Sequence, residues 1–298
     1  MELDVWNLSA SLRVSDRRFN NDAERIFHEV TTRVSRAANR FDETSEISRL
    51  NATRAMDMSD DFMALWRAAD RAVTLTNGAC NPAVLPALLA WGYDRDFSDI
   101  DHRDLALSPQ VGAAHFEGIH VDEVHGRVEL DDGVLLDLGS SAKAWTCDLI
   151  ADTIAPLSGV AVEIGGDVAV RGASPDGGTW AIGLSDSLLV GPGGPRIGLA
   201  HGGVATSSRK VRHWRVNGQR VNHVIDPMTG WPVAGELETV TVTAATCLEA
   251  NAFSTAALVW GHRDALSRIS QHGWSARAVC EDGSVITAGP WPSEETAA

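Results

Sequence analysis

The chain has 298 residues, of which 44% are hydrophobic and 22% are charged, so it is long enough for a substantial core and has an ordinary globular composition. Its formal net charge of −15 argues against nucleic acid or an anionic membrane surface as the main partner. A substrate that carries phosphate would need local positive charge or a metal ion to overcome this field.

The first third of the chain is expected to be rich in helices. Apolar side chains recur at helical spacing over residues 20–39 and again over residues 60–76. Pro82 and Pro86 frame a short third helix that ends near Trp91. The polar residues after about position 94 are expected to form peripheral strands and loops, up to about residue 132.

Near residue 133 the pattern changes to short apolar runs separated by glycines, which is typical of strands. Two helices are expected near 141–156 and 247–260, and the Gly-rich stretch 191–194 is expected to be a loop. The predicted strands cover residues 133–138, 159–164, 167–172, 179–184, 196–200, 203–206, 211–216, 220–225 and 238–245.

This order of elements indicates an α+β fold with two lobes that share a cleft. We expect one domain over residues 1–298. It would have a helix-rich part over about 1–95, a peripheral segment over about 95–132 and a strand-rich core over about 133–298.

The chain is expected to be a cytoplasmic protein that does not insert into membranes. Its start, Met1 to Trp6, has neither the basic nor the apolar region of a secretory signal, and no stretch is apolar for long enough to span a bilayer. The four cysteines lack metal-ligand spacing and are expected to be buried thiols in a reducing compartment.

Two glycine-containing turns are candidates for binding an anion. Asp137 to Lys143 closes a predicted strand and opens a helix, which Ser140 or Ser141 could cap, and Lys143 is one of only two lysines. Gly165-Gly166-Asp167 allows close approach of the backbone to a ligand but equally suits a tight hairpin. An ordinary strand-to-helix turn and a plain hairpin therefore stay open as alternatives.

A third candidate lies at the predicted helix 247–260. Thr246 and Glu249 have the spacing of a capping box, which places the start of the helix there. Asn251, Ser254 and Thr255 then share one face and offer oxygen atoms to a hard cation. The alternative is that these small polar side chains bond only to their neighbours.

The fourth candidate is the run from His223 to Gly230. His223 and Asp226 lie three residues apart and lead into a Pro-x-Thr-Gly turn, which suits a general acid/base pair on rigid backbone. A hydrogen-bonded structural histidine followed by an Asp-Pro turn is the other interpretation.

Together these motifs resemble the ApbE family, the FAD:protein FMN transferases, and the resemblance covers about residues 38–261. Its fold is α+β, with mixed, largely antiparallel sheets flanked by helices and FAD in a cleft between two lobes. The matching segments are Phe41 to Asn51, Asn77 to Pro82 with Trp91-Gly92, Asp137 to Lys143, Ile164 to Asp167, Val204 to Ser207, His223 to Gly230 and Glu249 to Thr255.

The resemblance implies a reaction in which FMN moves from FAD to a Thr or Ser hydroxyl of an acceptor protein, with release of AMP and the help of Mg²⁺. His223 would transfer the proton and Asp226 would orient it. The flavin nucleotide would be held by Phe41, Ala79, Cys80, Asn81, Asp137, Lys143, Gly165, Gly166, Asp167 and Ile225. The metal ion would be held by Ser140, Asn251, Ser254 and Thr255.

The sequence departs from the family pattern where the metal and the flavin are expected. Asn251 replaces the aspartate that binds the metal, Asn81 replaces another aspartate, and Ser140 replaces a glycine. Because Mg²⁺ prefers carboxylates, its binding should be weaker here. Two alternatives follow: a protein that binds FAD without transferring FMN, and an FAD pyrophosphatase that yields FMN and AMP.

Overall fold

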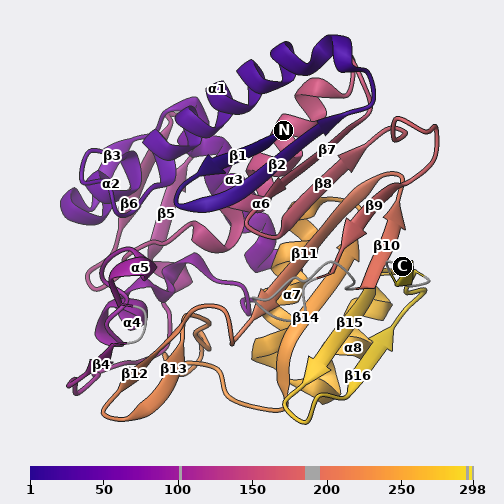
Figure 1. Ribbon diagram of the computed structural model, residues 1–298. Coiled ribbons are helices and arrows are strands. Elements are labelled where there is room, and N and C mark those ends of the chain that lie inside the picture. Colours follow the sequence, from indigo (N-terminus) through magenta and orange to yellow (C-terminus); the bar gives the residue numbers. More distant parts are fainter. Residues whose placement is uncertain (101–102, 185–194, 293–294, 297–298) are drawn as a thin grey trace.

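The computed structural model describes residues 1–100, 103–184, 195–292 and 295–296 (Figure 1), so the expected loop at 191–194 lies outside the described residues. Its centre is an eight-stranded sheet in which every neighbouring pair is antiparallel. From one edge to the other its strands are β1 (Glu2–Val5), β2 (Leu8–Val14), β7 (Val160–Ile164), β8 (Asp167–Arg171), β11 (Gly202–Ser208), β14 (Leu237–Ala244), β15 (Ser275–Cys280) and β16 (Val285–Ala288).

The central strands of this sheet are buried on both faces. Successive side chains of a strand point to opposite faces, so Val160 and Val162 of β7 join one hydrophobic cluster while Ala161 joins another. In β8, Ala169 and Val170 divide between the same two clusters. This explains why these strands read in the sequence as nearly continuous apolar runs.

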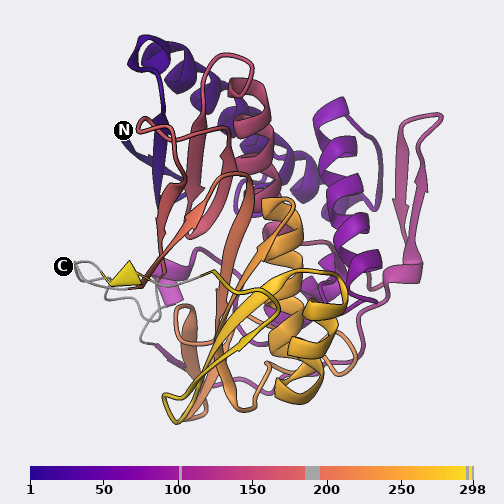
Figure 2. The ribbon, with the colours of Figure 1, turned by 90° about the vertical axis from the view of Figure 1, so that its right-hand side faces the viewer.

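Helices form a layer on one face of the sheet, as Figure 2 shows. The two central ones, α6 and α7, pack against each other and against the middle strands. The helix predicted at 247–260 is confirmed over those residues, whereas α8 was not expected from the sequence. The helices of this layer are α1 (Asn20–Ala38), α3 (Asp60–Leu75), α6 (Gly139–Ile154), α7 (Cys247–Trp260) and α8 (His262–Gln271).

The start of α7 is held by two different acceptors. The Thr246 hydroxyl accepts a hydrogen bond from the Glu249 backbone N–H at 3.1 Å, which confirms the predicted cap. The Asp148 carboxylate of α6 accepts from the backbone N–H groups of Cys247 and Leu248, at 3.0 and 2.9 Å. A negative charge at a helix N-terminus is stabilising, so Asp148 ties α6 to α7.

Asp148 also belongs to a buried ion pair. Its carboxylate lies 3.0 Å from a nitrogen of Arg171, which in turn donates to the Gly202 carbonyl. Both charged side chains are almost fully buried. The pair therefore joins α6 to β8 and β11 beneath the start of α7.

Smaller sheets complete the fold. Strands β9 and β10 pack over the face of the large sheet that the helices leave uncovered. One parallel pair, β4 with β12, makes the sheets mixed but largely antiparallel, as predicted. The remaining strands are β9 (Trp180–Gly183), β10 (Pro195–Leu199) and β17 (Glu295–Thr296); β4 (Asp104–Leu105), β12 (His213–Val216) and β13 (Gln219–Asn222); and β3 (Ala55–Asp57), β5 (Ile119–Asp122) and β6 (Arg127–Leu130).

A separate aromatic cluster lies under the short helices. The Trp214 indole of β12 donates to the Trp91 carbonyl, and the Trp91 indole donates to the Gly230 carbonyl, at 2.8 and 2.9 Å. These bonds fasten the His223 to Gly230 run to the end of α4. The short helices are α2 (Glu46–Thr53), α4 (Leu85–Ala90) and α5 (Phe97–Ile100), with 3₁₀ turns at Arg17–Phe19, Pro82–Val84 and Phe116–Gly118.

Two sequence predictions about residues 133–141 are wrong. Residues 133–138 do not form a strand, because the Asn51 side chain donates to the Leu136 carbonyl and accepts from its N–H, taking the place of a neighbouring strand. Neither Ser140 nor Ser141 caps α6, since the helix already begins at Gly139, whose N–H donates to the Asp137 carboxylate at 2.7 Å.

Two further findings concern the whole of the described chain. The four cysteines are free and buried, as predicted. Among the described residues, no helix has the length and apolar character needed to cross a membrane.

Candidate functional site

Two of the predicted motifs meet where α6 begins and β8 begins. Gly165 and Gly166 have positive φ values of 57° and 90°, so they form a two-residue hairpin turn that places Asp167 at the start of β8. The Lys143 ammonium lies 2.6 Å from Oδ2 of Asp167. The Asp167 side chain is almost fully buried, and Lys143 is partly exposed. The hairpin thus presents a carboxylate to the lysine of the neighbouring helix.

A second ion pair involves Asp137 and a residue that the sequence did not single out, Arg40. Nε of Arg40 lies 2.8 Å from Oδ2 of Asp137. The guanidinium lies between two rings, 4.1 Å from the centre of Phe41 and 4.6 Å from the centre of Tyr93. Arg40 is buried, yet its Nη2 has no hydrogen-bond partner among the described residues. An unpaired, buried donor is costly, so this nitrogen is a candidate to donate a hydrogen bond to a ligand oxygen.

His223 follows β13 and faces two cations. Its Nδ1 lies 3.3 Å from the Arg212 carbonyl. Burial, together with the positive charges of Arg212 and Lys143, lowers the pKa of His223 to about 3. The imidazole is therefore neutral near pH 7, and a proton on Nδ1 that points to the carbonyl leaves Nε2 free to accept another.

These groups form one continuous set, which we call the charged cluster: Arg40, Asp137, Lys143, Asp167, Arg212 and His223. Arg212 closes the set because its guanidinium lies 3.4 Å from the Tyr93 hydroxyl, beside Arg40. With His223 neutral, the cluster holds three cations and two carboxylates. Two further carboxylates act on its cations, Asp96 on Arg212 and Asp94 on Arg40. The cluster is therefore an array of paired charges within a protein of net charge −15, and its cations are candidates to contact a phosphate-bearing substrate.

Three of the four residues predicted to bind a metal ion, Asn251, Ser254 and Thr255, are joined by hydrogen bonds. The Asn251 amide donates to Asp167 at 3.0 Å, and its oxygen accepts from the Thr255 hydroxyl at 3.3 Å. The Ser207 hydroxyl lies 2.8 Å from that of Ser254 and 3.0 Å from that of Thr255. Among the described residues, no group of three or more His, Cys, Asp or Glu side chains is placed to hold a metal ion. These residues do not fit a Mg²⁺ ion held by the protein.

Residues 79–81 and Ser140 lie against each other. Ala79, Cys80 and Asn81 are all buried. The Asn81 oxygen accepts from the Ala83 N–H, and the Cys80 thiol lies 4.0 Å from the Ser140 carbonyl. Burial raises the pKa of Cys80 to about 11, so it is a thiol rather than a thiolate. The predicted contact of these residues with a flavin stays a prediction.

The Asp226 carboxylate forms hydrogen bonds within the turn that Asp226 begins. Its carboxylate accepts from the Met228 N–H at 2.9 Å and from the Thr229 hydroxyl at 3.1 Å. Ile225 pairs with Pro232 across the base of this turn. The partner found for His223 is instead the Arg212 carbonyl, so Asp226 shapes the backbone that follows the histidine.

Sequence reasoning missed Arg40, Tyr93 and Arg212. Arg40 is adjacent to Phe41, and Tyr93 is the only tyrosine in the chain, but neither fact indicates a site. Their role depends on distances between segments more than 50 residues apart. A partial signal existed for Arg212, because it lies just before β12 and close in the sequence to the His223 run.

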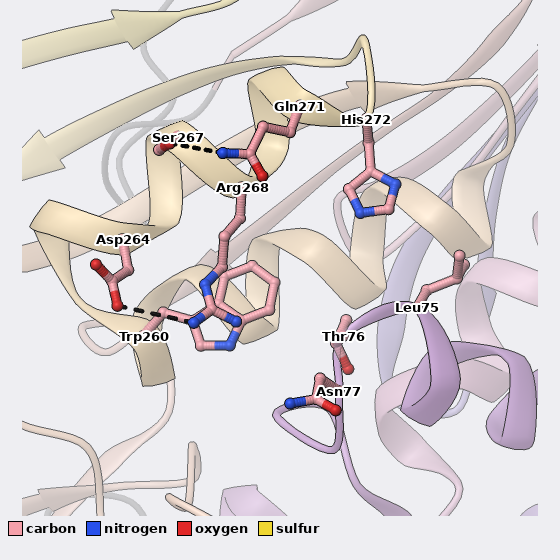
Figure 3. A pocket seen from close by; sticks show the side chains of 9 residues that line it. All are labelled: Leu75, Thr76, Asn77, Trp260, Asp264, Ser267, Arg268, Gln271 and His272. Carbon is pink, nitrogen blue, oxygen red and sulfur yellow. Dashed lines mark hydrogen bonds and ion pairs between the residues drawn. The ribbon is translucent and has the colours of Figure 1, made fainter.

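One surface cavity lies away from the charged cluster. It has a volume of about 450 Å³ and lies between the end of α3 and α8 (Figure 3). Four of its polar side chains are paired, since Arg268 contacts Asp264 and Gln271 bonds to Ser267. A second cavity of about 300 Å³ borders Ile225, which connects it to the His223 run.

Comparison with known proteins was consistent across sequence and structure. The model of the ApbE family matches residues 5–278. The FAD:protein FMN transferase of Haemophilus influenzae is 26% identical over 86% of this chain and 76% of its own length, and that of Vibrio cholerae is 26% identical over 82% and 74%. The ApbE protein of Thermotoga maritima superposes with a TM-score of 0.83 at 26% identity, over 97% of this chain and 96% of its own.

Proposed function

The chain belongs to the ApbE family, and on this basis we propose that it is an FAD:protein FMN transferase. Relatives that carry this name match most of the chain. Its substrates would be FAD and an acceptor protein with a Thr or Ser hydroxyl, and its second product would be AMP.

The proposed reaction is a phosphoryl transfer. The acceptor hydroxyl oxygen attacks the phosphorus of the FMN half of FAD, and the bond from this phosphorus to the bridging oxygen breaks. FMN becomes joined to the acceptor by a phosphoester, and the bridging oxygen leaves with AMP. The hydroxyl proton must go to a base, and the charge on the phosphates must be balanced throughout.

The observation that carries the proposal is the state of His223. A neutral imidazole whose Nδ1 faces the Arg212 carbonyl has its Nε2 available for the acceptor proton. The phosphates of bound FAD would bring negative charge beside this ring and raise its pKa, which makes it a better base in the complex than in the free protein. Asp226 contributes by shaping the turn.

The cations of the charged cluster are suited to contact the pyrophosphate. We propose that Lys143 and Arg40 face the nucleotide, that Asp137 and Asp167 hold these two cations in place, and that the exposed ring of Phe41 covers it. The hairpin glycines, residues 79–81 and Ile225 would border the same space. The predicted Mg²⁺ ligands do not fit that ion, so we derive no step through a metal.

The test uses the purified protein, FAD and a synthetic peptide with one central threonine. A matched peptide with valine at that position is the control, because valine has the same shape without the hydroxyl. Reactions with Mg²⁺ and with EDTA are followed for AMP, free FMN and covalent flavin fluorescence on the peptide. We expect AMP and labelled threonine peptide in equal amounts.

The other outcomes identify the two alternatives. AMP and free FMN without either peptide would show a pyrophosphatase, and bound FAD without any AMP would show a binding protein. His223→Gln should abolish labelling while FAD binding persists. Unchanged labelling by this variant would remove His223 from the mechanism.

A further inference from the structure

We propose that the cation that faces the pyrophosphate in this protein is the Lys143 ammonium group, and that FAD binding does not require a divalent metal ion. This inference deepens the proposed function and rests on FAD being the ligand. It follows from the hydrogen bonds around Asp167 and Asn251.

Asp167 is already neutralised. One of its oxygens, Oδ2, lies 2.6 Å from the Lys143 ammonium and 3.0 Å from the Asn251 amide nitrogen. Asn251 thus presents N–H groups, rather than lone pairs, to the carboxylate. The opposite orientation of the amide would place its oxygen against the carboxylate oxygen, so the network fixes the orientation seen here.

The oxygen atoms of the predicted metal ligands Asn251, Ser254 and Thr255 are also engaged. The Asn251 side-chain oxygen accepts from Thr255, and the Asn251 carbonyl accepts from Ser254 at 3.0 Å. The Ser207 hydroxyl joins these two hydroxyls from β11. A divalent ion between these side chains would have to break this network, and the carboxylate beside them is already paired with Lys143.

The charges lead to the same conclusion. Lys143 and Asp167 cancel, and Asn251 is neutral, so these three residues carry no net negative charge to attract Mg²⁺. Magnesium loses its water reluctantly and is bound in proteins mainly through carboxylates. An aspartate at position 251 would remove the donor, place a second carboxylate beside Asp167 and favour a cation between them.

The decisive variant is therefore Asn251→Asp, with Asn251→Leu as the matched control because leucine has a similar shape and no charge. Binding of Mn²⁺ to the FAD-free proteins is measured by electron paramagnetic resonance. FAD affinity is measured by flavin fluorescence in EDTA and in Mg²⁺. Circular dichroism verifies that each variant is folded.

We expect the affinity of the wild-type protein for FAD to change by less than about twofold between EDTA and Mg²⁺. Asn251→Asp should bind Mn²⁺ at least about tenfold more tightly than the wild type and should make FAD binding dependent on Mg²⁺. Asn251→Leu should do neither. Lys143→Met should weaken FAD binding roughly tenfold in the wild-type background, with no rescue by Mg²⁺.

Two results would overturn the inference. One is a wild-type protein that binds FAD much more tightly in Mg²⁺ than in EDTA, a measurement that does not depend on any variant folding. Another is wild-type affinity for Mn²⁺ equal to that of Asn251→Asp. If no condition gives FAD binding at all, the proposed function fails instead.

Discussion

Replacement of His223 by glutamine should change how stability depends on pH. An unfolded histidine has a pKa near 6.5, whereas in the folded protein the pKa of His223 is lowered to about 3. Below pH 6.5, His223 therefore takes up a proton in the unfolded state but stays neutral in the folded state. The free energy of unfolding decreases as the pH falls. Each pH unit below 6.5 lowers the free energy of unfolding by about 1.4 kcal/mol, so at pH 5 the loss reaches about 2 kcal/mol.

His223→Gln lacks this titration but keeps a side chain that can donate to the Arg212 carbonyl. Urea unfolding at pH 7.5 and pH 5 should show that the wild type loses about 2 kcal/mol more than the variant over this interval. His28→Gln is the control, because it removes an exposed histidine of α1 that is far from His223 in the sequence. Equal losses for wild type and His223→Gln would refute a buried, neutral imidazole.

Three further predictions concern the frame of the site and its binding groups. Asp148→Ala should destabilise the fold by about 3 kcal/mol and lower Tm by roughly 6 °C in calorimetry, because a buried ion pair is broken. Gly203→Ala should cost about 3 kcal/mol in urea unfolding, since its Cβ would lie 2.2 Å from the Cys247 nitrogen; Gly183→Ala, which meets nothing within 4 Å, should be tolerated. Arg40→Met should weaken FAD binding roughly tenfold by fluorescence titration, and unchanged affinity would mean that its unpaired nitrogen faces no ligand.

Much of the fold was predictable because local patterns and tertiary burial agree. The period of apolar residues in 20–39 and 60–76 matches the faces that α1 and α3 bury. The alternation of Leu8, Ala10, Leu12 and Val14 is an equally clear signal for β2, which the predicted strands did not include. The prediction of a strand at 133–138 was wrong, because a single side chain, Asn51, supplies the hydrogen bonds of the Leu136 backbone.

The candidate site likewise has features that the sequence predicts and contacts that it does not. The Thr246 cap and the hairpin turn before Asp167 depend on residues close in sequence, and both were recognisable. The contacts of Arg40 with Asp137, and of Asn251 with Asp167, join segments that are 97 and 84 positions apart. No local pattern encodes such contacts.

The sequence by itself determined the helices, most of the strands and the motifs that resemble one enzyme family, because all of these depend on neighbouring residues. Only the tertiary structure decided how those motifs act on each other. It brought cations and carboxylates of distant segments together, and it engaged three of the four predicted metal ligands in hydrogen bonds beside Asp167. The physical reason is that electrostatic and hydrogen-bond energies depend on distance in space, which residue order does not specify.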